Sequence, residues 1–146
     1  IAGNFQRVGV LVVDGGQPHL VPALAGRVSA IVEIAGGARL REGSKSLADS
    51  VRWILATGMQ DRNAVLAGAV PFLHLCGVVC GGWQMARAAL TAQRKLAAGD
   101  GDLPFYRAKI ATARFFADQD LTRAAGLRDA AIHAAAGTMA LAEEQF

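Results

Sequence analysis

Three side chains that could bind a metal or act in catalysis lie close together near the centre of the chain: His74, Cys76 and Cys80. On a helix the two cysteines share a face one turn apart, where continuous helical backbone generally prevents a disulfide. His74 is too close to Cys76 for both to point the same way. No fourth ligand stands at a recognisable zinc spacing, and no serine or aspartate completes a hydrolytic triad. We therefore assign no catalytic residue and no metal ligand, and interpret the histidine as a core or interface residue and the cysteines as small core residues.

Basic side chains flank a turn that contains Asp100. If this turn joins two antiparallel helices, the basic residues on either side of it come to lie opposite one another. They could then bind an anion such as phosphate or coenzyme A, or simply form a solvated face whose charges neighbouring carboxylates balance. The pairs expected opposite each other, which are the candidate anion-binding or interface residues, are Arg87 with Arg114 and Arg94 with Arg107, with Lys95 and Lys109 nearby.

Composition indicates one all-α domain. The chain has 146 residues, of which 53% are hydrophobic and only 6% aromatic. Much of the hydrophobic content is alanine, which favours closely packed helices over a β-sandwich. The net charge of +3 is too small to predict nucleic-acid binding. The start of the chain has no signal-peptide pattern, and free thiols are typical of a reducing compartment, so we expect a cytoplasmic protein.

Periodicity predicts four helices joined by short connections, an up-down-up-down bundle with a long C-terminal helical hairpin. Residues 1–18 are expected to be an irregular lead-in, and residues 19–146 the bundle. The expected helices cover residues 19–35, 38–57, 63–98 and 102–136. Asp61 and Asp102 are expected to cap the third and fourth helices, and Pro71 to bend the third.

The third helix contains a stretch without formal charge, from Ala64 to Met85. Its length is enough to cross a bilayer, and Gly77 and Gly81 have the spacing of membrane helix pairs. The alternative is a helix apolar on every side because neighbouring helices cover every side. We favour the second interpretation, since three amphipathic helices need an apolar partner and the stretch lacks aromatic belts.

Three segments resemble the C-terminal helical extension of a bacterial subgroup of acyl-CoA dehydrogenases that includes the methylmercaptopropionyl-CoA dehydrogenases. These segments are Leu66 to Leu73 (LAGAVPFL), Gly81 to Leu90 (GGWQMARAAL) and Phe105 to Phe116 (FYRAKIATARFF). The resemblance covers about residues 38–146, including the ending AEEQF.

This resemblance implies a parent enzyme that uses FAD to dehydrogenate acyl-CoA thioesters. The catalytic glutamate of these enzymes lies in a Tyr-Glu-Gly-Thr type motif that the chain lacks, so no catalytic or FAD-binding residue is carried over. We expect a structural domain that packs on the rest of the dehydrogenase, contributes to a homo-oligomer and holds no cofactor itself. The alternatives are a stand-alone helical interaction module and a membrane-associated bundle. The hairpin should outreach the shorter helices, and we expect self-association through its uncovered end.

Overall fold

The computed structural model describes residues 37–138, 140 and 143–145, so the lead-in and the first expected helix lie outside the described residues. The elements are α3 (Gly37–Thr57), α4 (Arg62–Ala67), α5 (Ala69–Ala98), α6 (Leu103–Gln119), η2 (Leu121–Arg123), α7 (Ala124–Thr138) and η3 (Glu143–Gln145). Since no described residue lies in a strand, the all-α prediction is confirmed.

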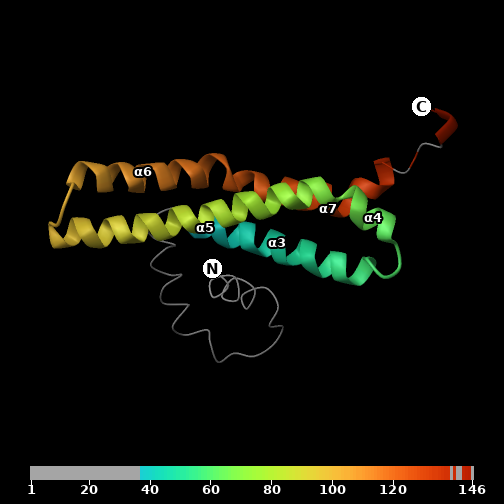
Figure 1. The fold of residues 1–146 in the computed structure, drawn as a ribbon, viewed down its shortest axis with the longest axis horizontal. Coiled ribbons are helices and arrows are strands. Elements are labelled where there is room, and N and C mark those ends of the chain that lie inside the picture. Colours follow the sequence, from blue (N-terminus) through green and yellow to red (C-terminus); the bar gives the residue numbers. More distant parts are fainter. Residues whose placement is uncertain (1–36, 139, 141–142, 146) are drawn as a thin grey trace, which may run out of the picture.

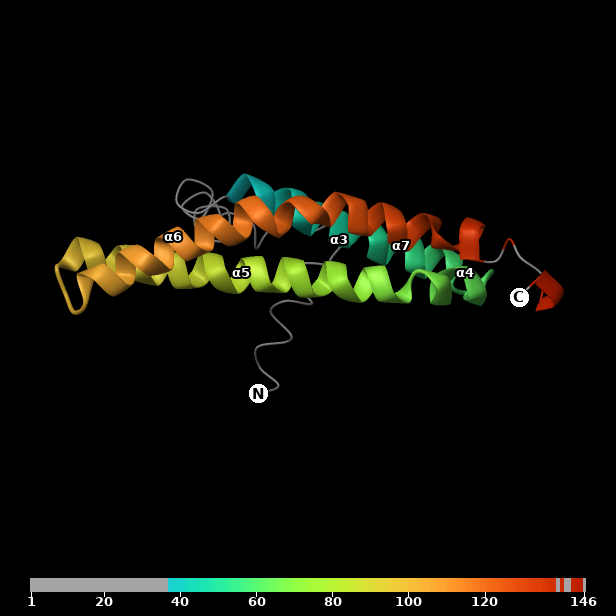
Figure 2. The ribbon, with the colours of Figure 1, turned by 90° about the horizontal axis from the view of Figure 1, so that it is seen from above.

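The helices form an elongated bundle around α5 (Figures 1 and 2). α6 returns along the C-terminal half of α5, α7 continues along its N-terminal half, and α3 packs on both α5 and α7. The long C-terminal hairpin is thus confirmed. Its free end extends beyond α3, because α5 has 30 residues and α3 only 21. We call residues 84–116 the hairpin end.

α3 matches the expected second helix closely, and small residues form its buried face: Gly37, Gly43, Ser46 and Ser50. A side chain at Gly43 would place its Cβ 3.3 Å from Val79 Cγ2, so the absence of one lets α3 approach α5. The apolar residues of α3 do not all lie on its buried side, since Leu55 is 73% exposed although it follows the half-buried Ile54. Successive helical residues are turned by about 100°, so the two cannot share one narrow face.

The third expected helix is divided at Gly68 rather than bent at Pro71. The Asp61 cap is confirmed, since its carboxylate accepts a hydrogen bond of 2.9 Å from the amide of Ala64. The division puts Pro71 in the first turn of α5, where its missing N–H leaves no carbonyl of that helix unpaired. It also coincides with a close helix contact, because a Cβ on Gly68 would lie 2.1 Å from the carbonyl oxygen of Ala131 in α7.

The fourth expected helix is interrupted as well, between α6 and α7. Asp102 caps α6 as predicted, through a hydrogen bond of 3.0 Å from the amide of Phe105, and Pro104 lies in the first turn. Beyond Gln119 the hydrogen bonding tightens to a 3₁₀ turn, in which the amide of Arg123 donates to the carbonyl of Asp120 at 3.1 Å. This turn brings Leu121 into the core beside α3 and α5, which explains the departure from one continuous helix.

Two small clusters form the core. Leu75, Val79 and Ala124 are packed with Leu47 and Leu127 where α3, α5 and α7 meet. Ala89 and Ala113 are packed with Met85 and Ile110 inside the hairpin. Alanine at these contacts lets the helix axes approach closely, as the composition indicates.

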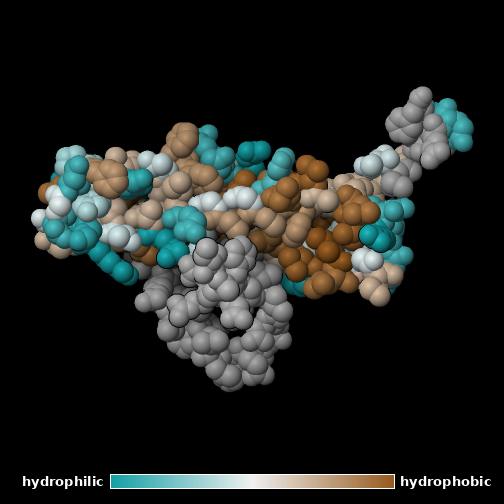
Figure 3. Space-filling model, viewed as in Figure 1, coloured by the Kyte–Doolittle hydropathy of each residue, from teal (hydrophilic) through white to brown (hydrophobic). Residues whose placement is uncertain are grey.

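The described helices do not cover the charge-free stretch on all sides, so this prediction is wrong. Leu66, Val70 and Leu73 follow one another at helical spacing and are 58%, 63% and 67% exposed. Leu55 and Met59 at the end of α3 are exposed too. Figure 3 shows a hydrophobic area at the end of the molecule where α3, α4 and α5 meet. We call these five residues the aliphatic face.

α5 also satisfies the length and composition of a membrane span, and it is the one described helix that does. Of its most apolar section, 22% is buried in the bundle. A single such helix is weak evidence for a membrane, because a core helix of a water-soluble protein can have the same length and composition.

Candidate functional site: a basic groove in the hairpin

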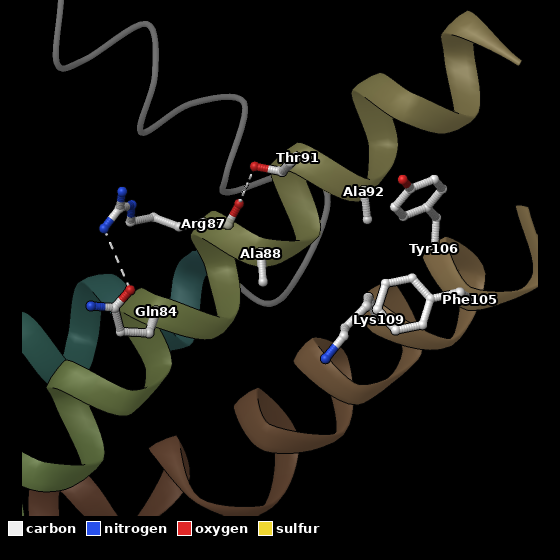
Figure 4. A pocket seen from close by; sticks show the side chains of 8 residues that line it. All are labelled: Gln84, Arg87, Ala88, Thr91, Ala92, Phe105, Tyr106 and Lys109. Carbon is white, nitrogen blue, oxygen red and sulfur yellow. Dashed lines mark hydrogen bonds between the residues drawn. The ribbon is translucent and has the colours of Figure 1, made fainter. Parts of the chain in front are cut away.

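A groove lies between α5 and α6 at the hairpin end, with a volume of about 380 Å³ (Figure 4). Among the described residues, its lining combines cations, aromatic rings and small or polar side chains and includes no carboxylate. The lining residues are Gln84, Arg87, Ala88, Thr91 and Ala92 from α5 and Phe105, Tyr106 and Lys109 from α6.

The groove exists because large side chains on α6 face small ones on α5. Ala88 and Ala92 lie one turn apart on α5, and both point towards the rings of α6 (Figure 4). The Asp102 cap fixes the start of α6, and the rings of Phe105 and Tyr106 meet edge to face with 5.6 Å between centroids. Gly101 has φ +82, and a Cβ there would lie 3.1 Å from the Tyr106 hydroxyl, so glycine allows both this turn and this ring position.

Within the described part of the chain, the two cations of the groove contact aromatic rings and no carboxylate. The ammonium of Lys109 lies 5.2 Å from the centroid of the Phe105 ring. The guanidinium of Arg87 lies 4.7 Å from the centroid of the Trp83 ring, and it donates a long hydrogen bond of 3.4 Å to the Gln84 side-chain oxygen. These are weak, exposed contacts. Figure 4 shows that the Arg87 side chain extends towards Gln84 and away from Lys109 and the rings of α6.

Positive charge is concentrated at the hairpin end. It carries six basic and two acidic side chains, a net charge of +4, whereas the whole chain has +3. Both acids already have partners: Asp102 accepts from the Phe105 amide, and Asp100 accepts from Lys95. The hydrogen bond and charge of Asp100 raise the pKa of Lys95. Among the described residues, basic side chains thus outnumber acidic ones at the hairpin end.

The structure brings together only part of the basic set expected from the sequence. Arg87 lines the groove, and the cation from α6 is Lys109, which was expected only nearby. Arg94, Arg107 and Arg114 are exposed at the hairpin end but do not line the groove. The sequence analysis did not include the aromatic pair of Phe105 and Tyr106. A signal was present, because Phe105 and Lys109 are four residues apart, the spacing that places two side chains on one helix face.

The central histidine and cysteines lie elsewhere, on α5. His74 is exposed and therefore not a core residue. Cys76 is half-buried and Cys80 exposed, and both are free thiols. Burial raises the pKa of the Cys76 thiol, and the nearby Cys80 adds to this. Within the described part of the chain, no three His, Cys, Asp or Glu side chains come together as a metal site.

Comparison with known proteins identifies the class to which this helical chain belongs. Residues 24–142 match the family described as acetyl-CoA dehydrogenase C-terminal like, and the chain belongs to this family. It is a C-terminal domain of the acyl-CoA dehydrogenase family, as the sequence resemblance implied. Among curated proteins, it is similar to 3-methylmercaptopropionyl-CoA dehydrogenase of Ruegeria pomeroyi. The two are 48% identical over 83 residues, which are 57% of this chain and 14% of the relative.

The family implies FAD in the complete enzyme. Three of the described helix N-termini, those of α4, α5 and α6, have no free amides for its pyrophosphate. A dinucleotide pyrophosphate is commonly bound by free amides at a helix N-terminus. Here the N-termini of α4 and α6 are occupied by the carboxylates of Asp61 and Asp102. The N-terminus of α5, at Gly68, is packed against α7. None of these helix ends can receive a pyrophosphate without displacing an existing contact.

Proposed function

We propose that this chain is the C-terminal helical domain of an FAD-dependent enzyme that introduces an α,β double bond into acyl-CoA thioesters. Its own role is structural: it packs on the catalytic body of the same enzyme and contributes to a homo-oligomer. Membership in the C-terminal family supports the assignment to a dehydrogenase. The match to 14% of the relative is consistent with one domain of a much longer enzyme. The free thiols of Cys76 and Cys80 support a cytoplasmic location.

The aliphatic face is the observation that carries the structural role. Five large apolar side chains, from α3, the turn after it, α4 and α5, are exposed where these elements meet. Between Arg62 and Arg87 the chain has no acidic or basic side chain except His74, so a partner can cover this side without burying an unpaired charge. A contiguous apolar surface of this kind is typical of a protein interface. The occupant proposed is the catalytic body.

Self-association of the chain on its own tests this proposal. Without the catalytic body, the aliphatic face should meet the same face of a second copy. The sequence analysis predicted self-association through the uncovered hairpin end. The exposed aliphatic residues instead lie at the opposite end of the bundle. Sedimentation velocity should therefore show concentration-dependent dimers or larger species at micromolar chain. Replacing Val70 and Leu73 together by serine should restore the monomer.

Phe115→Ser is the matched control, because Phe115 is 66% exposed but lies in the hairpin end. It should leave self-association unchanged. A wild-type chain that stays monomeric at all concentrations would contradict the docking role of the face. So would a Phe115→Ser chain that becomes monomeric while the double serine variant does not.

The catalytic part of the proposal needs a separate assay. The full-length protein encoded by the complete reading frame should reduce an electron acceptor when acyl-CoA and FAD are supplied. The 146-residue chain on its own should not. Activity of the isolated chain would refute a purely structural role. Failure of the complete protein to reduce the acceptor would refute the assigned reaction.

A membrane-associated bundle is the second candidate, because α5 has the length and composition of a span and exposes an apolar side. Co-sedimentation with liposomes distinguishes the two. The proposed docking role predicts that the chain stays in the supernatant once the catalytic body is present.

A further inference from the structure

We propose that Cys76 and Cys80 on α5 form a two-coordinate site for a soft metal ion, Cu(I). Both cysteines are free thiols, and Cys80 is exposed while Cys76 is half-buried, so an ion in solution can reach them. The two thiols do not line the groove and are not among the five residues of the aliphatic face. Nothing in the structural role proposed above requires them.

The two thiols are neighbours on one face of a regular helix. They are four residues apart within α5, which is one α-helix over Ala69–Ala98. Side chains at this spacing have Cβ atoms about 5–6 Å apart. Burial raises the pKa of the Cys76 thiol, and the charge of Cys80 raises it further. Because such an electrostatic effect weakens with distance, it supports two sulfur atoms that lie close together.

This spacing suits a bridging ion better than a disulfide. A disulfide requires Cβ atoms about 3.5–4.5 Å apart, which is closer than a regular helix holds them. A thiolate sulfur binds a first-row metal such as zinc at about 2.3 Å, so two sulfurs on opposite sides of one ion are about 4.6 Å apart. Rotation about the Cα–Cβ bonds can set this separation without moving the backbone. The pair can therefore bridge an ion where it resists closing into a disulfide.

The number and kind of ligands select the ion. Within the described part of the chain, no third His, Cys, Asp or Glu side chain joins the two thiols. His74 is two residues before Cys76, so it points to another side of α5. Structural zinc takes four ligands and iron–sulfur clusters take four cysteines, whereas soft Cu(I) is stable between two thiolates. α5 also has no acidic side chain that would attract a hard cation such as Mg²⁺.

Competition with a chromogenic Cu(I) chelator tests the inference on the full 146-residue chain, without oxygen and with ascorbate as reductant. The chain should bind one Cu(I) per molecule. Two protons should be released per ion, because each thiol loses its proton as its sulfur bonds to the metal, and the copper stays monovalent. Cys76→Ser and Cys80→Ser should each weaken binding by about 100-fold, since a chelating pair becomes a single ligand. Urea unfolding should confirm that both variants fold normally.

His74→Cys combined with Cys80→Ser is the matched control. This double variant keeps two thiols, at positions 74 and 76, but places them on different sides of α5. His74 is exposed, so a cysteine there meets no packing constraint. The double variant should bind Cu(I) no more tightly than Cys80→Ser alone. His74→Gln should bind it as tightly as the wild-type chain.

The inference is overturned if either serine variant, or the double variant with displaced thiols, binds Cu(I) as tightly as the wild-type chain. Zinc that binds as tightly as Cu(I) would contradict a two-coordinate site. So would an ion that links two chains, seen as copper-dependent dimers when Val70 and Leu73 are both replaced by serine. None of these results affects the proposed dehydrogenase, whose activity is measured with the complete enzyme.

Discussion

The close packing of Gly68 on α7 offers a direct test of the described fold. Gly68 separates α4 from α5 and lies against the middle of α7. Replacing it by alanine would place a Cβ 2.1 Å from the carbonyl oxygen of Ala131 and 3.0 Å from its carbonyl carbon. Both are backbone atoms of a helix, so neither can move aside as a side chain would. The two helices must separate instead.

The expected cost follows from this geometry. The Cβ would lie about 1 Å inside the closest contact that such atoms tolerate. Overpacking of a well-packed core costs about 1–3 kcal/mol, and we expect about 3 kcal/mol here because the clash is with backbone. Gly68 has φ −86 and ψ 0, which alanine can adopt, so the effect arises from the clash rather than from backbone strain. A chain of this size should lose about 10 °C in Tm.

Gly126→Ala supplies the matched control. Gly126 lies in α7, and a Cβ there would meet nothing within 4 Å. The same chemical change should stabilise the chain by about 0.5–1 kcal/mol, since glycine is the poorer helix former. The two variants should thus shift the free energy of unfolding in opposite directions, measured by urea denaturation followed by circular dichroism. A Gly68→Ala chain as stable as Gly126→Ala would refute the close packing of α4, α5 and α7.

Other consequences concern the core, a helix cap and the thiols. Leu75→Ala should cost about 3 kcal/mol in urea unfolding, because Leu75 is fully buried between α3, α5 and α7. Asp102→Ala should cost about 1 kcal/mol in the same assay, since the Phe105 amide loses its acceptor, whereas Asp102→Asn should retain most of the stability. A thiol reagent should label exposed Cys80 before half-buried Cys76. Because the pKa of Cys76 is raised, less of it is thiolate at a given pH, and its labelling in a Cys80→Ala chain should keep accelerating as the pH rises past the ordinary thiol range.

Local patterns in the sequence were enough to predict the helical segments and some of their ends. Asp61 and Asp102 cap the helices that the periodicity predicted, and Gly99 ends α5 with φ +65. Each of these features depends on residues a few positions apart, so the sequence contains all the information that they need. The family was also recognisable from short strings such as AKIATARFF, residues 108–116.

The candidate site could be predicted only in part. The sequence located the positive charge around the turn and identified Arg87 as a residue of interest. It did not distinguish Lys109, which faces the groove, from Arg107 and Arg114, which do not line it. Pairing across a hairpin depends on the rotation of each helix about its own axis. Packing of Ala89 on Ala113 sets that rotation, and residue spacing alone does not.

The sequence by itself thus determined the all-α class, the long hairpin, the helix caps and the family. Tertiary structure decided the division at Gly68, the 3₁₀ turn at Leu121 and the exposure of the side of α5 that carries Val70 and Leu73. The division, the turn and the exposure all depend on contacts between residues far apart in the chain, such as Gly68 with Ala131. Apolar residues recur at the same helical spacing whether they are covered by a helix of their own chain or by another protein. The charge-free stretch therefore predicted a covered helix, and only the packing revealed which side the described bundle leaves open.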